Sequence, residues 1–178
     1  GGAVLPRAEG PALAVAAGRR LAVAAMPIAV TFVGRQAGMA EETRVQETAY
    51  REQIWRTFGE LVAASPNYEA VALPAGAAAD EVIHKTILHA AGLLDAEAFR
   101  KIKSFALPER FLYGAVHLEG RTQETLRLSV KTYHADALLR IVDGNTLTYR
   151  QVQGQADNSD LDAAVSAALC DALGKPGS

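Results

Sequence analysis

Residues 137–153 read ALLRIVDGNTLTYRQVQ, and this stretch does most to decide the fold. Apolar and polar residues alternate on both sides of Asp143, Gly144 and Asn145. Such alternation is typical of half-buried strands, and Asp-Gly supplies the positive φ angles of a tight hairpin turn. The stretch therefore predicts two antiparallel strands, 137–142 and 147–153.

Toward the C-terminus, the periodicity changes from two to that of a helix. Ser159, with Asp162 three residues later, resembles a capping box, and Gly174 followed by Pro176 closes the segment. Between these ends, apolar residues form one stripe, at Leu161, Val165, Ala168, Leu169, Ala172 and Leu173. We therefore expect a final helix that packs on the sheet.

Toward the N-terminus, alternation predicts two more strands, at 111–118 and 125–133. Further upstream, strands and helices alternate. The expected strands are 28–34 and 68–74, and the expected helices are 41–64, 80–91 and 96–105. The element order is β-α-β-α-β-β-β(-β)-α. This order predicts an α/β (α+β) fold with a mixed β-sheet covered mainly on one face by helices.

A chain of 178 residues suits a single domain. We place that domain at 27–175, after an N-terminal extension (1–26) that is either an extra strand or partly flexible, and before a short tail (176–178). The extension and first strand share an alanine-rich apolar run, but Arg19 and Arg20 interrupt it. A membrane span needs about 20 uninterrupted apolar residues. We therefore expect a buried strand here, with a secretory targeting segment as the alternative.

Composition excludes several classes of protein. With 49% apolar residues and a net charge of −2, the chain is unlike disordered proteins. It also lacks the basic excess typical of nucleic-acid binding, so we expect no nucleic-acid partner. The single cysteine, Cys170, rules out an internal disulfide and any multi-cysteine zinc site. Because alanines surround it, we expect Cys170 to be buried.

The sequence holds none of the common phosphate-binding, nucleophile or metal motifs. His84 and His89 stand five residues apart, a spacing that does not bring two ligands to one face of a helix. The acidic run from Asp157 to Asp162 lacks the glycine and terminal glutamate of a calcium loop. We therefore predict no catalytic residues, no cofactor and no metal site.

One charge cluster has a shape that suits a binding surface. It comprises Arg100, Lys101, Lys103 and Arg110. These cations lie where a helix is expected to end and the next strand to begin, and they could meet an anionic partner. The alternative is a solvated helix end next to a loop. We take the four as candidate partner-binding residues.

Four stretches, taken in order, resemble a known family. Residues 28–32 (IAVTF) match its opening strand, and 48–74 match its long helix, turn and second strand. Residues 111–116 (FLYGAV) resemble the strand that ends in G-x-V, and 137–153 resemble its apolar hairpin. Over about 27–175, the chain thus resembles the domain shared by the N-terminal domain of TolB and by CsgG-, LpoB-, PelC- and FlgT-type bacterial envelope proteins. It departs from their pattern at the turn, which is DGNT rather than Thr-Gly, and it has no lipobox cysteine.

This resemblance implies a non-enzymatic accessory protein of the cell envelope. Such a protein binds other proteins in export, surface-appendage assembly or cell-wall synthesis. The implied location is the periplasm, with an outer-membrane anchor on the precursor and homo-oligomerisation left open. The rival hypothesis is a cytosolic small-ligand-binding domain or enzyme on a mixed α/β sheet. Its first candidate residues are His84, His117 and His134, which would need to share a pocket with a carboxylate.

Overall fold

A computed structural model describes residues 5–8, 20–34, 45, 47–72 and 109–175. The expected helices at 80–91 and 96–105 lie outside these residues. In chain order the elements are β1 (Leu21–Gly34), α2 (Thr48–Ala64), β2 (Tyr68–Ala70), β3 (Arg110–Thr125), β4 (Leu128–Asp143), β5 (Thr148–Asn158) and α5 (Leu161–Leu173). None of the described helices is long and apolar enough to cross a bilayer.

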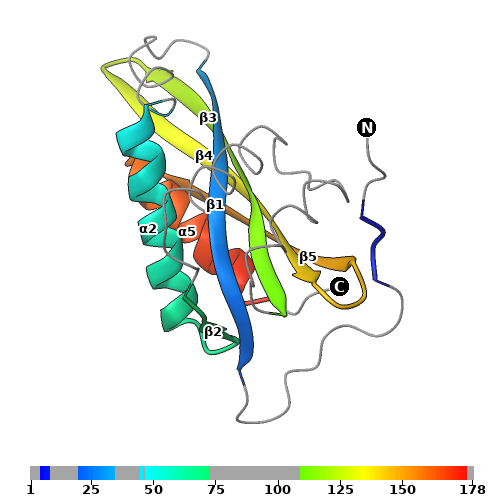
Figure 1. Cartoon of the computed structure of the whole chain (residues 1–178). Coiled ribbons are helices and arrows are strands. Elements are labelled where there is room, and N and C mark those ends of the chain that lie inside the picture. The colour runs from blue at the N-terminus through cyan, green and yellow to red at the C-terminus, as the bar shows by residue number, and fades with distance from the viewer. Residues whose placement is uncertain (1–4, 9–19, 35–44, 46, 73–108, 176–178) are drawn as a thin grey trace.

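The five strands form one sheet in the order β2-β1-β3-β4-β5. Strand β1 runs parallel to both β2 and β3, whereas β3, β4 and β5 are joined as antiparallel hairpins. Helices α2 and α5 lie side by side against the same face of this sheet (Figure 1). The predicted fold class, a mixed sheet covered on one face, is confirmed.

The core fills the space between the sheet and the two helices. Helix α2 contributes a stripe of buried residues four apart, Tyr50, Ile54, Phe58 and Val62. Helix α5 buries alanines among leucines and a valine, and it lies so close to β5 that a Cβ at Gly154 would meet backbone atoms of Ala168 and Ala172. Only glycine therefore permits this approach.

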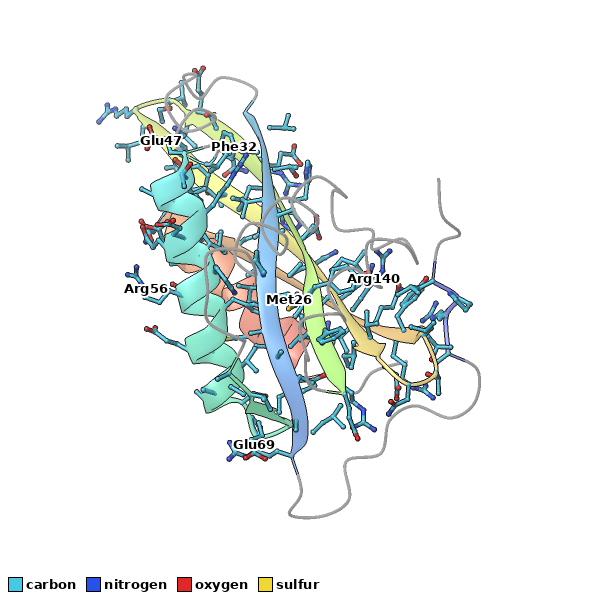
Figure 2. The ribbon with its side chains drawn as sticks, viewed as in Figure 1. Met26, Phe32, Glu47, Arg56, Glu69 and Arg140 are labelled. Atoms are coloured by element: carbon cyan, nitrogen blue, oxygen red, sulfur yellow. The ribbon has the colours of Figure 1, made fainter. Side chains whose placement is uncertain are left out.

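Strand β1 begins at Leu21, seven residues before the predicted start at Ile28. Its pairing with β3 is interrupted between Ala25 and Ile28, because Pro27 has no N–H to donate. The interruption changes which side chains face the helices. Val23 precedes it and Ile28 follows it, and both belong to the core. Figure 2 shows Met26 midway along this strand.

Strand β4 is longer than the sequence predicts. Residues 128–133 and the expected strand 137–142 belong to one continuous strand, Leu128–Asp143, because His134, Ala135 and Asp136 pair in register with β3. The expected strand 125–133 therefore begins too early, since Thr125 ends β3 and residues 126 and 127 form a turn. No glycine or proline separates the two predicted parts of β4.

Strands β3 and β4 also continue beyond their neighbours. The last pair of β1 is Gly34 with Gly120, and that of β5 is Asn158 with Tyr133. Residues 121–132 therefore form a two-stranded extension, here called the ribbon, which turns at Leu126 and Arg127. The ribbon tip and the β4–β5 turn lie at opposite ends of the molecule (Figure 1).

The β4–β5 turn occupies the predicted place but differs in form. Asp143 pairs with Thr148, so residues 144–147 connect the strands, one position later than the connection 143–146 that the predicted strands leave. The positive φ falls on Leu147, at 54°, and not on Gly144. Glycine at 144 instead relieves a tight approach, since a Cβ there would lie 3.0 Å from the Glu109 carbonyl oxygen.

Two predictions about α5 are wrong in detail. The residue that caps the helix is Asp160, whose side chain accepts a hydrogen bond from the Ala163 N–H at 2.9 Å, and not Ser159. Cys170 is exposed rather than buried, because the face of α5 that meets the sheet passes through its neighbours Ala168, Leu169 and Ala172.

Candidate functional site

Of the four cations predicted to bind a partner, Arg110 is the one that the structure describes. Arg100, Lys101 and Lys103 lie outside the described residues. Arg110 is the first residue of β3, and its Nε lies 3.9 Å from Oδ2 of Asp143 at the end of β4. Arg110 and Asp143 occupy paired positions on neighbouring strands.

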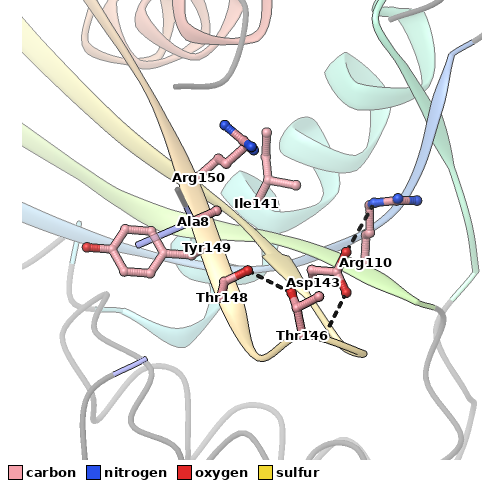
Figure 3. Close-up of a pocket in the computed structure, with 8 residues that line it drawn as sticks. All are labelled: Ala8, Arg110, Ile141, Asp143, Thr146, Thr148, Tyr149 and Arg150. Atoms are coloured by element: carbon pink, nitrogen blue, oxygen red, sulfur yellow. Dashed lines mark hydrogen bonds and ion pairs between the residues drawn. The ribbon is translucent and has the colours of Figure 1, made fainter. Parts of the chain in front are cut away.

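A cavity of about 340 Å³ opens beside this ion pair, at the end of the sheet that carries the β4–β5 turn. Figure 3 shows the side chains that surround it. They come from all three antiparallel strands, from the turn and from the N-terminal segment: Ala8, Arg110, Ile141, Asp143, Thr146, Thr148, Tyr149 and Arg150.

Strand register explains how the cavity is built. Arg110, Asp143 and Thr148 stand in one row across β3, β4 and β5. Ile141 and Arg150 pair two residues further along, and thus on the same face, with Ile141 between the two arginines in Figure 3. Side chains at alternate positions share a face of a sheet, so both guanidinium groups belong to the helix-bearing face, beside an apolar patch.

Hydrogen bonds in the turn fix the polar wall of the cavity. Oδ1 of Asp143 accepts hydrogen bonds from the N–H groups of Asn145 at 2.8 Å and Thr146 at 3.1 Å. The hydroxyls of Thr146 and Thr148 lie 2.7 Å apart and are hydrogen-bonded to each other. Asp143 is thus held by the turn, and only its second oxygen faces Arg110.

The charges of the lining residues do not cancel. Two guanidinium groups, from Arg110 and Arg150, are matched by the single carboxylate of Asp143. Within the part of the chain that the structure describes, Arg150 has no ion-pair partner. Guanidinium groups bind carboxylates and phosphates through paired N–H donors. The cavity is therefore suited to an anionic group.

The N-terminal segment forms the outer wall by pairing with β5. The Ala8 N–H donates to the Tyr149 carbonyl at 2.7 Å, the Tyr149 N–H donates to the Pro6 carbonyl at 3.1 Å, and Leu5 is buried. Since the backbone groups of a strand alternate in direction, those of Gln151 and Gln153 also point outward. Neither has a hydrogen bond to a neighbouring strand on that side among the described residues.

The histidines of the rival hypothesis lie elsewhere. His84 is outside the described residues. His117 and His134 stand in β3 and β4 at positions that point away from the helices, and neither lines the cavity. His117 Nδ1 is hydrogen-bonded to the Thr31 hydroxyl at 2.8 Å.

His134 lies between two carboxylates. Its Nδ1 is 2.8 Å from Asp157, and its Nε2 is 3.3 Å from Asp136. Even so, no group of three or more histidine, cysteine or acidic side chains in the described ranges is placed to hold a metal ion.

Sequence reasoning missed Arg150 and the N-terminal wall. The predicted hairpin places Arg150 in a strand, but its position beside Arg110 depends on the register, in which Arg150 pairs with Ile141 and shares a face with Thr148. No sequence signal points to the pairing of Arg7 with Tyr149, which joins residues far apart in the chain.

Comparisons with known proteins give distant likenesses. No family model and no curated protein sequence matches the chain. Among solved structures, it is similar to a PelC dodecamer from Paraburkholderia phytofirmans, with 16% identity and a TM-score of 0.47 over 94% of this chain and 91% of that one. The hypothetical protein CT253 from Chlamydia trachomatis shares 14% identity over 78% of this chain and 72% of that one, with a TM-score of 0.43.

Lipoprotein GNA1162 from Neisseria meningitidis is 15% identical over 81% of this chain and 90% of that one, with a TM-score of 0.29. Because these identities and TM-scores are low, the function of the site is argued from its own geometry.

Proposed function

We propose that this chain is a non-enzymatic accessory protein of the bacterial cell envelope that binds other proteins. The order of the described elements supports the proposal, because the four stretches on which the resemblance rests fall in β1, in α2 and β2, in β3, and in β4 and β5. A periplasmic location and a homo-oligomeric state are part of the same proposal, as is a single domain over 27–175. Within the envelope, export, surface-appendage assembly and cell-wall synthesis are the processes that such a protein would serve.

The observation that carries the proposal is the excess of guanidinium groups over carboxylates in the cavity. Arg110 and Arg150 flank the largely buried side chain of Ile141 at the base of the cavity, and threonine hydroxyls line one side. These groups recognise an acidic side chain and the apolar surface next to it. The expected ligand is therefore an acidic segment of a partner protein, and Arg110 is the one described member of the predicted basic cluster.

The edge of β5 extends this surface with backbone groups. Pro6–Ala8 already pair with the first part of the edge, and Gln151 and Gln153 continue it. An extended peptide binds such an edge through main-chain hydrogen bonds, while pockets select its side chains. A partner strand beside Gln151 and Gln153 would bring its acidic side chain to Arg150.

Photo-crosslinking in the native host tests this proposal. A photoreactive residue replaces Thr146, which is exposed at the cavity, or Gln53, which is exposed on α2. We expect a specific protein adduct from position 146 and none from position 53. The adduct should weaken at least tenfold in the Arg110→Ser/Arg150→Ser variant, because both guanidinium groups are then lost.

The matched control is Arg56→Ser. Arg56 is exposed on α2 and points away from the sheet (Figure 2), so the adduct should persist. Equal adducts from both positions, or an adduct that ignores the arginine substitutions, would overturn the proposed surface.

A further inference from the structure

The ribbon, residues 121–132, contributes little to the packed structure. Beyond Gly120 and Tyr133, neither β1 nor β5 accompanies it, and every residue from 121 to 130 is exposed. At about 3.4 Å per residue, its tip stands about 20 Å beyond the end of β1. A projection of this length needs a reason other than the stability of the core.

The tip of the ribbon is apolar. Four large apolar side chains are exposed among the described residues, and three of them belong to the ribbon. Leu126 is fully exposed, Leu128 is 69% exposed and Val130 is 47% exposed. Leu128 and Val130 lie on the same face, because they are two residues apart on β4. Exposed apolar groups gathered in one place mark a contact surface.

Turn chemistry does not explain this choice of residues. Two-residue hairpin turns favour glycine, asparagine or aspartate with positive φ angles. Leu126 and Arg127 are neither of these types nor in that conformation. An apolar residue at the tip therefore serves neither the turn nor the core.

The ribbon carries one cation at its tip and two near its base. The ribbon carries Arg121, Arg127 and Lys131 against one acidic residue, Glu124. Arg121 is bonded to Glu119 at 3.3 Å, and Lys131 lies over the Tyr133 ring at 5.5 Å. Arg127, which lies between the two leucines, has no ion pair among the described residues.

We infer that the ribbon tip inserts shallowly into the surface of an anionic phospholipid bilayer. Leucine side chains at a convex tip can be surrounded by lipid chains on all sides, whereas a protein would need a matching hollow to bury them. Arg127 at the tip meets the phosphate groups, and Lys131 stands further back on the ribbon. Neither outer edge of the ribbon pairs with another strand among the described residues. We therefore expect only the turn to enter the apolar layer and the strands to stay among the headgroups.

The hydrogen bond from the Thr125 hydroxyl to the Leu128 carbonyl, at 3.0 Å, suits this position, because it satisfies one backbone group at the tip. The ribbon and the cavity lie at opposite ends of β4. A chain bound to a membrane by its ribbon would therefore present its cavity away from the lipid. This inference goes beyond the proposed function and does not depend on it.

Vesicle flotation of the full chain tests the inference. We expect the wild type to float with vesicles of phosphatidylcholine and phosphatidylglycerol, and to float far less with phosphatidylcholine alone. The Leu126→Ser/Leu128→Ser variant should lose at least tenfold in binding, because both inserted side chains become polar. Arg127→Ser should lose about fivefold on anionic vesicles, since one cation near such a surface contributes about that factor.

Val33→Ser is the matched control, because Val33 is also exposed but lies at the end of β1 outside the ribbon. It should bind like the wild type. Circular dichroism checks that each variant is folded. Failure of the wild type to float with anionic vesicles, or full binding by the double variant, would overturn the inference.

Light scattering after size exclusion measures the oligomeric state, and so tests whether the tip contacts a second copy of the chain instead of lipid. If the wild type is an oligomer that the double variant splits, and if neither protein binds vesicles, then the tip is a contact between copies and the lipid inference is wrong. Crosslinking at position 146 tests the cavity, and vesicle flotation tests the ribbon. If crosslinking finds no partner but the wild type still floats, then the proposed function fails and the lipid inference stands.

Discussion

Strand β4 ends in a turn on both sides, and the two turns differ in almost every respect. At Asp143–Thr148, one carboxylate accepts two backbone N–H groups, two threonine hydroxyls bond to each other, and glycine allows close contact with Glu109. At Leu126 and Arg127, a leucine and an arginine face solvent at the tip of an extension. The first turn is explained by the contacts it makes within the chain, whereas the second is not.

The difference separates two uses of the same hairpin scaffold. Where side chains satisfy their own backbone, residue choice follows stability. Where large apolar side chains stay exposed at little benefit to the fold, residue choice points to a contact outside the chain. Substitutions at the β4–β5 turn, or where α5 packs on the sheet, should therefore lower folding stability. Substitutions in the ribbon should not.

The largest loss of stability is expected from Gly154→Val, on β5 where α5 packs against it. Its new side chain would collide with backbone atoms of Ala168 and Ala172, so α5 must move off the sheet. We expect about 3 kcal/mol or more of destabilisation, measured by urea unfolding. The control is Gly59→Ala on α2, where a Cβ meets nothing within 4 Å. Because alanine favours a helix, that variant should gain about 0.5–1 kcal/mol. A tolerated Gly154→Val would contradict the close packing of α5.

A smaller loss is expected from Asp143→Ala at the packed turn. This change removes the acceptor for the N–H groups of Asn145 and Thr146 and also the partner of Arg110. We expect about 1–2 kcal/mol of destabilisation in urea unfolding. Asp143→Asn retains an oxygen acceptor and should lose less than half as much. Equal losses from both variants would show that charge, and not the turn, sets the effect.

A small, pH-dependent effect is expected at Asp171 on α5. Its carboxylate accepts the Gln155 backbone N–H at 2.9 Å and lies 3.2 Å from Nζ of Lys175, and these two contacts lower its pKa. A lowered folded-state pKa means that the contribution is present above the unfolded pKa, about 3.9, and is lost as pH falls through the folded value. Melting temperature should therefore fall less steeply below pH 4 in Asp171→Asn than in the wild type. If melting temperature falls equally steeply in both proteins, then the hydrogen bond between Asp171 of α5 and Gln155 of β5 does not contribute to stability.

The smallest change in stability is expected from Leu126→Ser/Leu128→Ser in the ribbon. Both side chains are exposed, so their loss leaves the buried core unchanged. The free energy of unfolding should stay within about 0.5 kcal/mol of the wild-type value. A loss above about 1.5 kcal/mol would mean that the ribbon packs against the rest of the chain and that the comparison between the two turns is false.

The sequence predicts the fold class and much of the element order because alternation and helical stripes reflect burial directly. It errs where a local rule competes with pairing. Residues 21–27 extend β1 although alanines blur their alternation and Pro27 interrupts it, and β4 runs on through His134 because β3 pairs with it. At the β4–β5 turn, the Asp-Gly signal is correct about position but not about conformation, because Leu147 and not Gly144 takes the positive φ.

The candidate site is harder to predict than the fold. Arg110 was identified from its charge, but Arg150 joins it only once the strand register is known. The N-terminal wall depends on pairing between Arg7 and Tyr149, which no local pattern encodes. Sequence reasoning also misses the tip of the ribbon, because alternation predicts a strand through 125–133, whereas residues 126 and 127 form an exposed turn.

Hydrogen–deuterium exchange of the full chain, with and without anionic vesicles, tests most directly whether the two ends of β4 differ in use. In this account the ribbon turn enters the bilayer and the ribbon strands lie among the headgroups. Exchange should therefore slow in residues 121–132 and stay unchanged in residues 143–158. Protection of the Asp143–Thr148 turn, or of neither region, would contradict it.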